Sequence, residues 1–523
     1  MSEQGGQAQR SGQGARAQTS GVADAAVGLI LTAAVLVHPT QLTVPLVEWA
    51  RAAGRILSPL RAVTDRLPAA NVTASDVLFL IAFVVWLLLR WRQRQLGEHV
   101  RRYPLALVGL FACACLSLVP FLKSWAPPIQ YGRAAKQLIQ LLLLFVCAYV
   151  PLVDYLGSER WRRKLVAAFF AAVACALLVG LAEYVRLRPP SPEARQAGAI
   201  ISPTQVDATF GYQGRPAGAG ERVGTASNRN VLGAWLTLVL PLLWAAFLFG
   251  SEPPWRTAAL ALAAGGALLL LHGGLWVAAL VAMLGLSFAR SRRAFAVTAA
   301  GMFVFYALAF SLGPQRHGQI LLDSLMLHRS EDRFRTLPLY EIDEELDRSG
   351  RGAVLDRPPY SPWEQKYIEW QPALVALAHN PAFGVGLGNY QPRIGGFYSA
   401  ADLSAYRMPK PSANLMEPGG NPFYAVWLAE TGLVGLLAFT WLAFVFLSRA
   451  ARGARAEADR LMKGLKLGSC AALGAACFGC LFTDYWVRGV GGAFAFVLAL
   501  ASASPQSQGG EGGAGADADQ VPS

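Results

Sequence analysis

The chain has 523 residues, of which 54% are hydrophobic and only 15% are charged, and its formal net charge is +13. A soluble domain carries charge on about a quarter of its residues, so this composition excludes an ordinary soluble enzyme. All seven cysteines lie inside apolar runs and none stands with histidines at the spacing of a zinc site. We therefore expect no metal, no cofactor and no exported disulfide framework, and we predict an all-α, polytopic membrane helix bundle.

The chain contains about twelve runs that approach the roughly 20 apolar residues a membrane-spanning helix needs. In chain order their apolar cores are Ala25–Val37, Val77–Leu89, Leu105–Leu122, Leu138–Leu152, Leu165–Leu181, Val231–Phe249, Ala258–Leu271, Leu275–Phe288, Ala294–Leu312, Phe423–Leu447, Leu467–Phe482 and Val490–Ala501. The first lacks a clean cleavage site, so we interpret it as a retained span and not as a signal peptide. We predict one transmembrane domain over 22–502.

The two ends of the chain, 1–21 and 503–523, are rich in Gly, Gln, Ser and Ala. Such segments cannot bury a core, so we expect both to be disordered cytoplasmic tails.

The basic residues indicate how the bundle is oriented. With the N-terminus in the cytoplasm, about one residue in three of the inner loops is Lys or Arg, against about one in eight of the short outer loops. Both termini are then cytoplasmic. The positive charge therefore indicates topology and contact with membrane lipids, and we expect no nucleic-acid partner. Two long loops, 185–230 and 313–422, fall on the outer face, where we expect the chemistry.

Three stretches resemble the O-antigen ligase and O-antigen polymerase superfamily. The first, Arg222–Trp235, has an arginine, a Gly-Thr pair and Asn-x-Asn-x-Leu at the entry to a span. The second, Tyr367–Tyr390, contains Trp-x-x-Ala-Leu followed by Asn-Pro-x-x-Gly-Val-Gly-x-Gly. The third, Asn421–Leu437, contains Leu-Ala-Glu-Thr-Gly-Leu-x-Gly. The family also shows twelve spans with a large extracytoplasmic loop between the ninth and tenth, here 313–422.

This resemblance implies a glycosyltransferase of the bacterial inner membrane that moves or polymerises saccharide units from an undecaprenyl-diphosphate carrier. The product would be a surface polysaccharide such as the O-antigen of lipopolysaccharide, a capsule or an exopolysaccharide. The implied partners are the carrier-linked glycan, a glycan or lipid acceptor, and a flippase or chain-length regulator. Polymerase and ligase stay open as alternatives.

The chain departs from the family pattern at three places. Gly420 stands where the family has a loop histidine, His272-Gly273-Gly274 replaces a Ser-Arg-Gly element, and Lys366 replaces an arginine. Gly420 and Gly273 support the alternative of a catalytically degenerate relative that acts as a transporter or accessory subunit, while the transferase stays the leading interpretation.

The proposed reaction needs cations, because the leaving group is a lipid diphosphate and guanidinium groups bind phosphate in a bidentate manner. The catalytic candidates are Arg222, Glu430 and Lys366. Arg222 could instead snorkel to the headgroups. Glu430 lies about two turns inside the tenth span, where a carboxylate is either functional or paired.

The substrate-binding candidates share a place near the outer face. They are Arg133, Lys136, Arg215, Asn228, Asn230, Asn421 and His272. Arg133 and Lys136 lie one helical turn apart and could instead contact lipid headgroups. Asn421 could cap the tenth span, and His272 could be an interfacial turn residue. With Gly420 in place of the histidine, Glu417, His379 or His272 could supply a base, or the reaction could need none.

The glycines 384, 386 and 388 resemble a phosphate-binding loop, but they follow a helix and not a strand. We interpret them as turn glycines, and Gly432 and Gly435 as sites of close helix approach.

Overall fold

The structure of the protein is a computed structural model in which part of the chain is described. The described residues are 21–40, 43–44, 72–97, 103–119, 128–186, 229–250, 261, 273–312, 362–390, 397, 422–481, 485 and 490–503. At some helix ends, residues 128–133, 179–186, 229–232 and 362–369 among them, only the backbone is described.

The described part of the chain is helical, which confirms the all-α class. Its helices are Gly21–Val37, α4 (Ala74–Arg92), α6 (Leu105–Leu116), α8 (Pro128–Leu142), the π-helix η2 (Leu143–Ala148), α9 (Tyr149–Gly157), α10 (Glu159–Arg186), α12 (Arg229–Phe249), α14 (Gly273–Arg290), α15 (Arg292–Leu312), α19 (Pro362–His379), α22 (Phe423–Ala456), α23 (Arg460–Gly479) and α24 (Val490–Ser502). A 3₁₀ turn, η1 (His38–Thr40), follows the first helix, and β1 (Thr43–Val44) pairs antiparallel with β2 (Val72–Thr73). The described parts of the predicted apolar runs lie on these helices or directly after them. Residues 120–122 of the third run, residue 482 of the eleventh, and the seventh run apart from Ala261 fall outside the described residues.

Four of the described helices are long and apolar enough to cross a membrane. They are Ala74–Arg92, Ala134–Gly157, Phe423–Ala456 and Arg460–Gly479. Shorter apolar helices are Gly21–Val37, Leu105–Leu116, Gly233–Phe249, Val277–Arg290 and Val490–Ser502. A helical membrane protein is the class that these features support, while twelve spans and the extent of the outer loop stay predictions.

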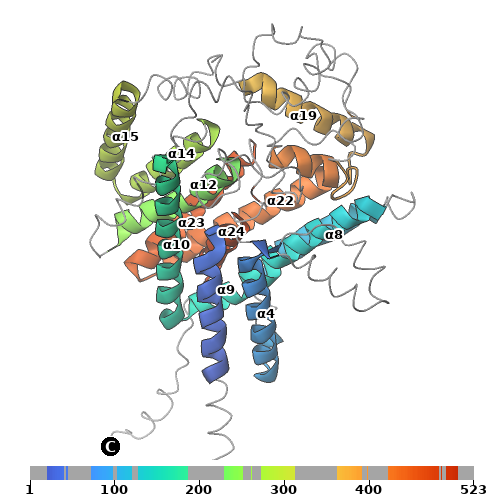
Figure 1. Cartoon of the computed structure of the whole chain (residues 1–523), viewed down its shortest axis with the longest axis horizontal. Coiled ribbons are helices and arrows are strands. Elements are labelled where there is room, and N and C mark those ends of the chain that lie inside the picture. The colour runs from blue at the N-terminus through green and yellow to red at the C-terminus, as the bar shows by residue number, and fades with distance from the viewer. Residues whose placement is uncertain are drawn as a thin grey trace, which may run out of the picture.

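The core forms where α23 packs against α12, α14 and α22 (Figure 1). Small residues allow α12 and α23 to approach closely, because a Cβ on Gly464 would meet Phe249 and one on Gly468 would meet Ala245. The short helix α24 is buried along nearly its whole length, and Phe496 stacks on Phe169 of α10 with ring centroids 4.4 Å apart. α24 is therefore a central element of the bundle.

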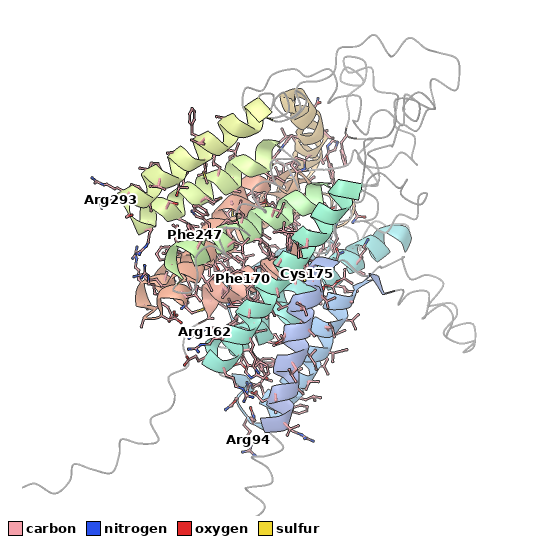
Figure 2. All side chains as sticks on the ribbon, turned by 60° about the vertical axis from the view of Figure 1, so that its left-hand side comes forward. Arg94, Arg162, Phe170, Cys175, Phe247 and Arg293 are labelled. Carbon is pink, nitrogen blue, oxygen red and sulfur yellow. The ribbon has the colours of Figure 1, made fainter. Side chains whose placement is uncertain are left out.

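Basic residues gather on one side of the bundle. In Figure 2, Arg94, Arg162 and Arg293 lie along the left and lower margin, and α19 lies at the upper end. These arginines belong to loops or helix ends that the charge count places inside. The orientation of the bundle in a membrane stays a prediction.

A buried ion network joins three helices on the basic side. Arg90 of α4 contacts Asp154 of α9 through Nη2 at 2.7 Å and through Nε at 2.9 Å, and Trp86 Nε1 donates to the same carboxylate oxygen at 2.8 Å. Arg90 Nη2 also lies 3.3 Å from Asp24 Oδ1 in the first helix, which accepts from Tyr155 Oη. The network fixes how the first helix, α4 and α9 meet.

Candidate functional site

Helix α22 is interrupted at Gly432. This residue has φ +67° and ψ −165°, a backbone conformation that only glycine adopts without strain. A regular α-helix would pair the Leu433 amide with the Ala429 carbonyl and the Val434 amide with the Glu430 carbonyl. The break removes both bonds and leaves four main-chain groups without helical partners.

A turn from another part of the chain binds all four groups. We call Pro381–Gly386 the inserted turn. Its bonds to α22 are Leu433 N to Pro381 O at 2.9 Å, Val434 N to Ala382 O at 3.2 Å, Val385 N to Ala429 O at 2.8 Å and Gly386 N to Glu430 O at 2.9 Å. Two broken helical bonds are thus replaced by four bonds to the inserted turn. Since non-helical backbone in a membrane must be satisfied by protein, this exchange explains how the break is tolerated.

Two glycines make the backbones fit. Gly384 has φ +67°, and a Cβ there would lie less than 3 Å from Ala429 O and Glu430 C. A Cβ on Gly432 would lie equally close to Ala382 O and C. Each glycine therefore leaves room for the backbone of the segment that contains the other. The second and third sequence motifs are in this way two halves of one crossing, and Figure 1 shows α19, which precedes the turn, across one end of α22.

Glu430 lies at the centre of this crossing. It is 1% exposed, and its carboxylate oxygen Oε1 accepts a long hydrogen bond from Tyr390 N at 3.4 Å. A fixed carboxylate in such surroundings can accept a hydrogen bond or a proton from a hydroxyl group.

The chain after the inserted turn continues along buried polar contacts. Leu387 N donates to Ser117 Oγ at 3.2 Å, where Ser117 is the C-cap of α6. Asn389 is 1% exposed, and its Nδ2 donates to Leu387 O at 3.0 Å. Within the described part of the chain, Asn389 Oδ1 has no hydrogen-bond partner.

A buried histidine contacts the end of the first motif. Trp235 Nε1 donates to His38 Nε2 at 3.1 Å, while His38 Nδ1 bonds to Val35 O, so the neutral Nδ1-protonated ring satisfies both partners. His38 is stacked on Phe169 with ring centroids 5.5 Å apart. Burial lowers the pKa of His38 to about 4. The ring is therefore neutral at physiological pH.

The predicted site residues fall into three groups. Glu430 is buried at the crossing, and Lys136 is half-buried on α8. Arg133 on α8, Asn230 in the first turn of α12 and Lys366 on α19 have a described backbone only. Arg222, Arg215, Asn228, Asn421 and His272 lie outside the described residues, so their roles stay predictions. The structure thus brings the second and third motifs together at Glu430.

The structure changes the interpretation of Gly432 and Gly435 and agrees with that of the other glycines and of His379. Gly432 does not serve close helix approach, because its free space faces the inserted turn. Gly435 makes room for Thr431 of its own helix. Glycines 384, 386 and 388 all have positive φ, which agrees with turn glycines. His379 Nδ1 bonds to Val375 O of its own helix at 2.8 Å, as a residue that ends a helix would.

The residues that sequence reasoning missed are Asn389, Ser117 and His38. Asn389 lies inside the second motif, directly before its final tyrosine, so its position was a usable signal. Ser117 lies inside the third apolar run and His38 directly follows the first, and neither position draws attention in the sequence. Only the fold shows what these two contact.

No protein-family model matches the chain, and no curated protein sequence matches it.

Proposed function

We propose that this protein is a multi-pass membrane glycosyltransferase that moves or polymerises saccharide units from an undecaprenyl-diphosphate carrier at the outer face of a bacterial inner membrane. The observation that carries the proposal is the crossing of Pro381–Gly386 with α22, which surrounds the buried Glu430. The two segments that cross are the ones whose sequences resemble the O-antigen ligase and polymerase superfamily. A carboxylate held by two such segments suits the binding or activation of an acceptor hydroxyl.

In the proposed reaction a sugar hydroxyl attacks the anomeric carbon of the carrier-linked glycan. A new glycosidic C–O bond forms, and the bond between the anomeric carbon and the phosphate oxygen breaks. The bonding electrons leave with the lipid diphosphate, and the hydroxyl proton passes to Glu430 or to water. Arg222, with Lys366, Arg133 and Lys136, is proposed to bind the diphosphate, because cations stabilise the charge that develops on the leaving oxygen.

A second candidate function is transport, and the break in α22 is the observation that favours it. Transporters bind substrates at discontinuous helices, where the ends of half-helices carry free amides and carbonyls. In α22 the inserted turn binds the amides of Leu433 and Val434 and the carbonyls of Ala429 and Glu430. Since these groups are already bonded to protein, the break is less suited to an ion or solute, and we favour the transferase.

The test is deletion of the gene followed by electrophoresis of the surface polysaccharide. A polymerase predicts loss of long chains, and a ligase predicts accumulation of lipid-linked polymer. Unchanged glycan in the deletion strain would exclude both and favour transport.

The role of the cations is tested on Arg222. The Arg222→Ala variant, expressed at the wild-type level, should reproduce the deletion phenotype, and the purified variant should bind undecaprenyl diphosphate at least about tenfold more weakly, because a bidentate ion pair is lost. Arg163→Ala is the matched control, since Arg163 is exposed on the basic side of the bundle. Equal binding by the Arg222→Ala variant would remove this residue from the site.

A further inference from the structure

The inserted turn and a continuous helix α22 compete for the same main-chain groups. The amides of Leu433 and Val434 and the carbonyls of Ala429 and Glu430 can pair with one another in a helix, or they can bind the turn. Each amide has a single hydrogen, so it cannot do both. The inserted turn and a continuous helix therefore exclude each other here, and the structure has the turn inserted.

Further bonds hold the interrupted arrangement on the α22 side. Trp427 Nε1, before the break, donates to Gly435 O, after it, at 2.9 Å. Thr431 Oγ1 donates to Trp427 O at 2.6 Å and fills the space above Gly435. The indole thus spans the break and fixes the angle between the two parts of α22.

Glu430 contacts the segment 386–390 with both its main chain and its side chain. Its main-chain carbonyl binds Gly386 N, and its carboxylate binds Tyr390 N, so two atoms of one residue contact one short segment. If α22 closed into a continuous helix, the Glu430 carbonyl would leave Gly386. The position of the carboxylate relative to Tyr390 therefore depends on the inserted turn.

We propose that the inserted turn is a positioning device for Glu430, and that Gly384 and Gly432 are its positioning residues. Their role is to let two backbones cross in contact, so that Glu430 and the segment 386–390 form one rigid unit. This proposal rests on the proposed function only in taking Glu430 as the working group of the transferase. The crossing itself is tested without any activity measurement.

The experiment compares amide hydrogen exchange in the purified full-length protein in detergent. Gly384→Ala and Gly432→Ala each place a methyl group against the opposite backbone. Each variant should raise exchange at residues 385, 386, 433 and 434 together by about tenfold or more, because both segments lose the same bonds. Gly474→Ala is the matched control, since nothing lies within 4 Å of its Cβ position on α23. Increased exchange confined to the substituted segment would overturn the coupling.

Ser117→Ala provides a variant without steric demand, in case the glycine variants do not accumulate. It removes the acceptor for Leu387 N and leaves α22 untouched. We expect faster exchange at 385 and 386 and also at 433 and 434. Exchange that rises at residue 387 and stays unchanged on α22 would overturn the proposal.

The positioning role is tested by comparing the amount of polymer made with the affinity for undecaprenyl diphosphate. In a deletion strain, Gly432→Ala at wild-type abundance should make at least about tenfold less polymer, because the carboxylate is displaced from its partners, while its affinity for undecaprenyl diphosphate changes less than about twofold. Normal polymer with raised exchange would overturn the positioning role. A wild-type protein that makes no glycan would instead defeat the proposed function and leave the exchange result standing.

Discussion

Gly386 donates its amide hydrogen to the main-chain carbonyl oxygen of Glu430 at 2.9 Å. This bond joins two segments that lie far apart in the sequence, a glycine-rich turn after α19 and the interior of a membrane helix. It also explains why both segments contain a glycine at this point, because Gly384 and Gly432 are needed for the same close approach of the two backbones. The predictions that follow test what this crossing and the other buried polar groups contribute.

Glu430→Gln is expected to reduce glycan transfer strongly while leaving the fold intact. The amide is isosteric and can still accept from Tyr390 N, but it cannot take a proton. We expect the amount of polymer per molecule of protein to fall by about a hundredfold, the scale of general base catalysis. Gel analysis of surface glycan in a deletion strain measures it. Glu159→Gln, an exposed carboxylate on α10, should behave as wild type. Wild-type polymer from Glu430→Gln would show that the carboxylate has a structural role only.

Asp154→Ala is expected to destabilise the protein strongly, because it leaves the buried end of Arg90 without its closest partner and removes the acceptor for Trp86. Breaking a buried ion pair from one side typically costs about 3 kcal/mol. Arg163→Ala removes the exposed Glu159–Arg163 pair and should cost less than about 0.5 kcal/mol. Denaturant unfolding in mixed micelles compares the two. Equal effects would mean that the network does not secure the first helix, α4 and α9.

The buried pair of Lys466 and Glu457 should show strong coupling. Nζ lies 2.6 Å from Oε2, and the side chains are 2% and 4% exposed, where α22 ends and α23 packs on it. Lys466→Met alone should lower the free energy of unfolding by about 3 kcal/mol, because it leaves Glu457 buried without its cation. Adding Glu457→Leu should recover most of that loss. A double-mutant cycle in mixed micelles measures the coupling, and strict additivity would contradict it.

His38 predicts an acid-sensitive fold. Its pKa is about 4 in the folded protein and 6.5 in the unfolded chain, so the unfolded chain binds a proton first as the pH falls. The neutral ring contributes its full stabilisation near pH 7 and loses it progressively between about pH 6.5 and pH 4, by roughly 3 kcal/mol in total.

The matched variant for this effect is His38→Gln, which can still accept from Trp235 and does not titrate. The melting temperature of the wild type should fall between pH 7 and pH 4.5 by more than that of the variant. Parallel curves would show that other groups cause the acid sensitivity.

Much of the fold could be predicted from the sequence, because each spanning helix forms its backbone hydrogen bonds within one short segment of the chain. The run Val77–Leu89 lies within α4, and α23 contains the run Leu467–Phe482 as far as Gly479, since a membrane helix satisfies its own backbone and needs only a long apolar stretch. The apolar run of the short helix α24 falls below the roughly 20 residues that a membrane-spanning helix needs. Its burial among α9, α22 and α23 explains how a short apolar helix holds its place.

The candidate site was less predictable, because its contacts are not local. The sequence shows the glycines of the two motifs, but it does not show that they serve the same contact between two segments. Neighbouring residues in the sequence do not reveal that Gly432 faces Ala382. The same holds for His38. The sequence indicates a loop residue, and only the fold shows that Trp235 donates a hydrogen bond to it.

Apolar run length alone determined that this is a helical membrane protein, because the bilayer acts on each segment separately. The sidedness of the loops, which the basic residues indicate, stays a prediction. Only the tertiary structure decided that α22 is broken, that the break is filled by Pro381–Gly386, and that Glu430 lies buried there. The reason is that a main-chain group with no partner in its own helix must find one elsewhere in the fold.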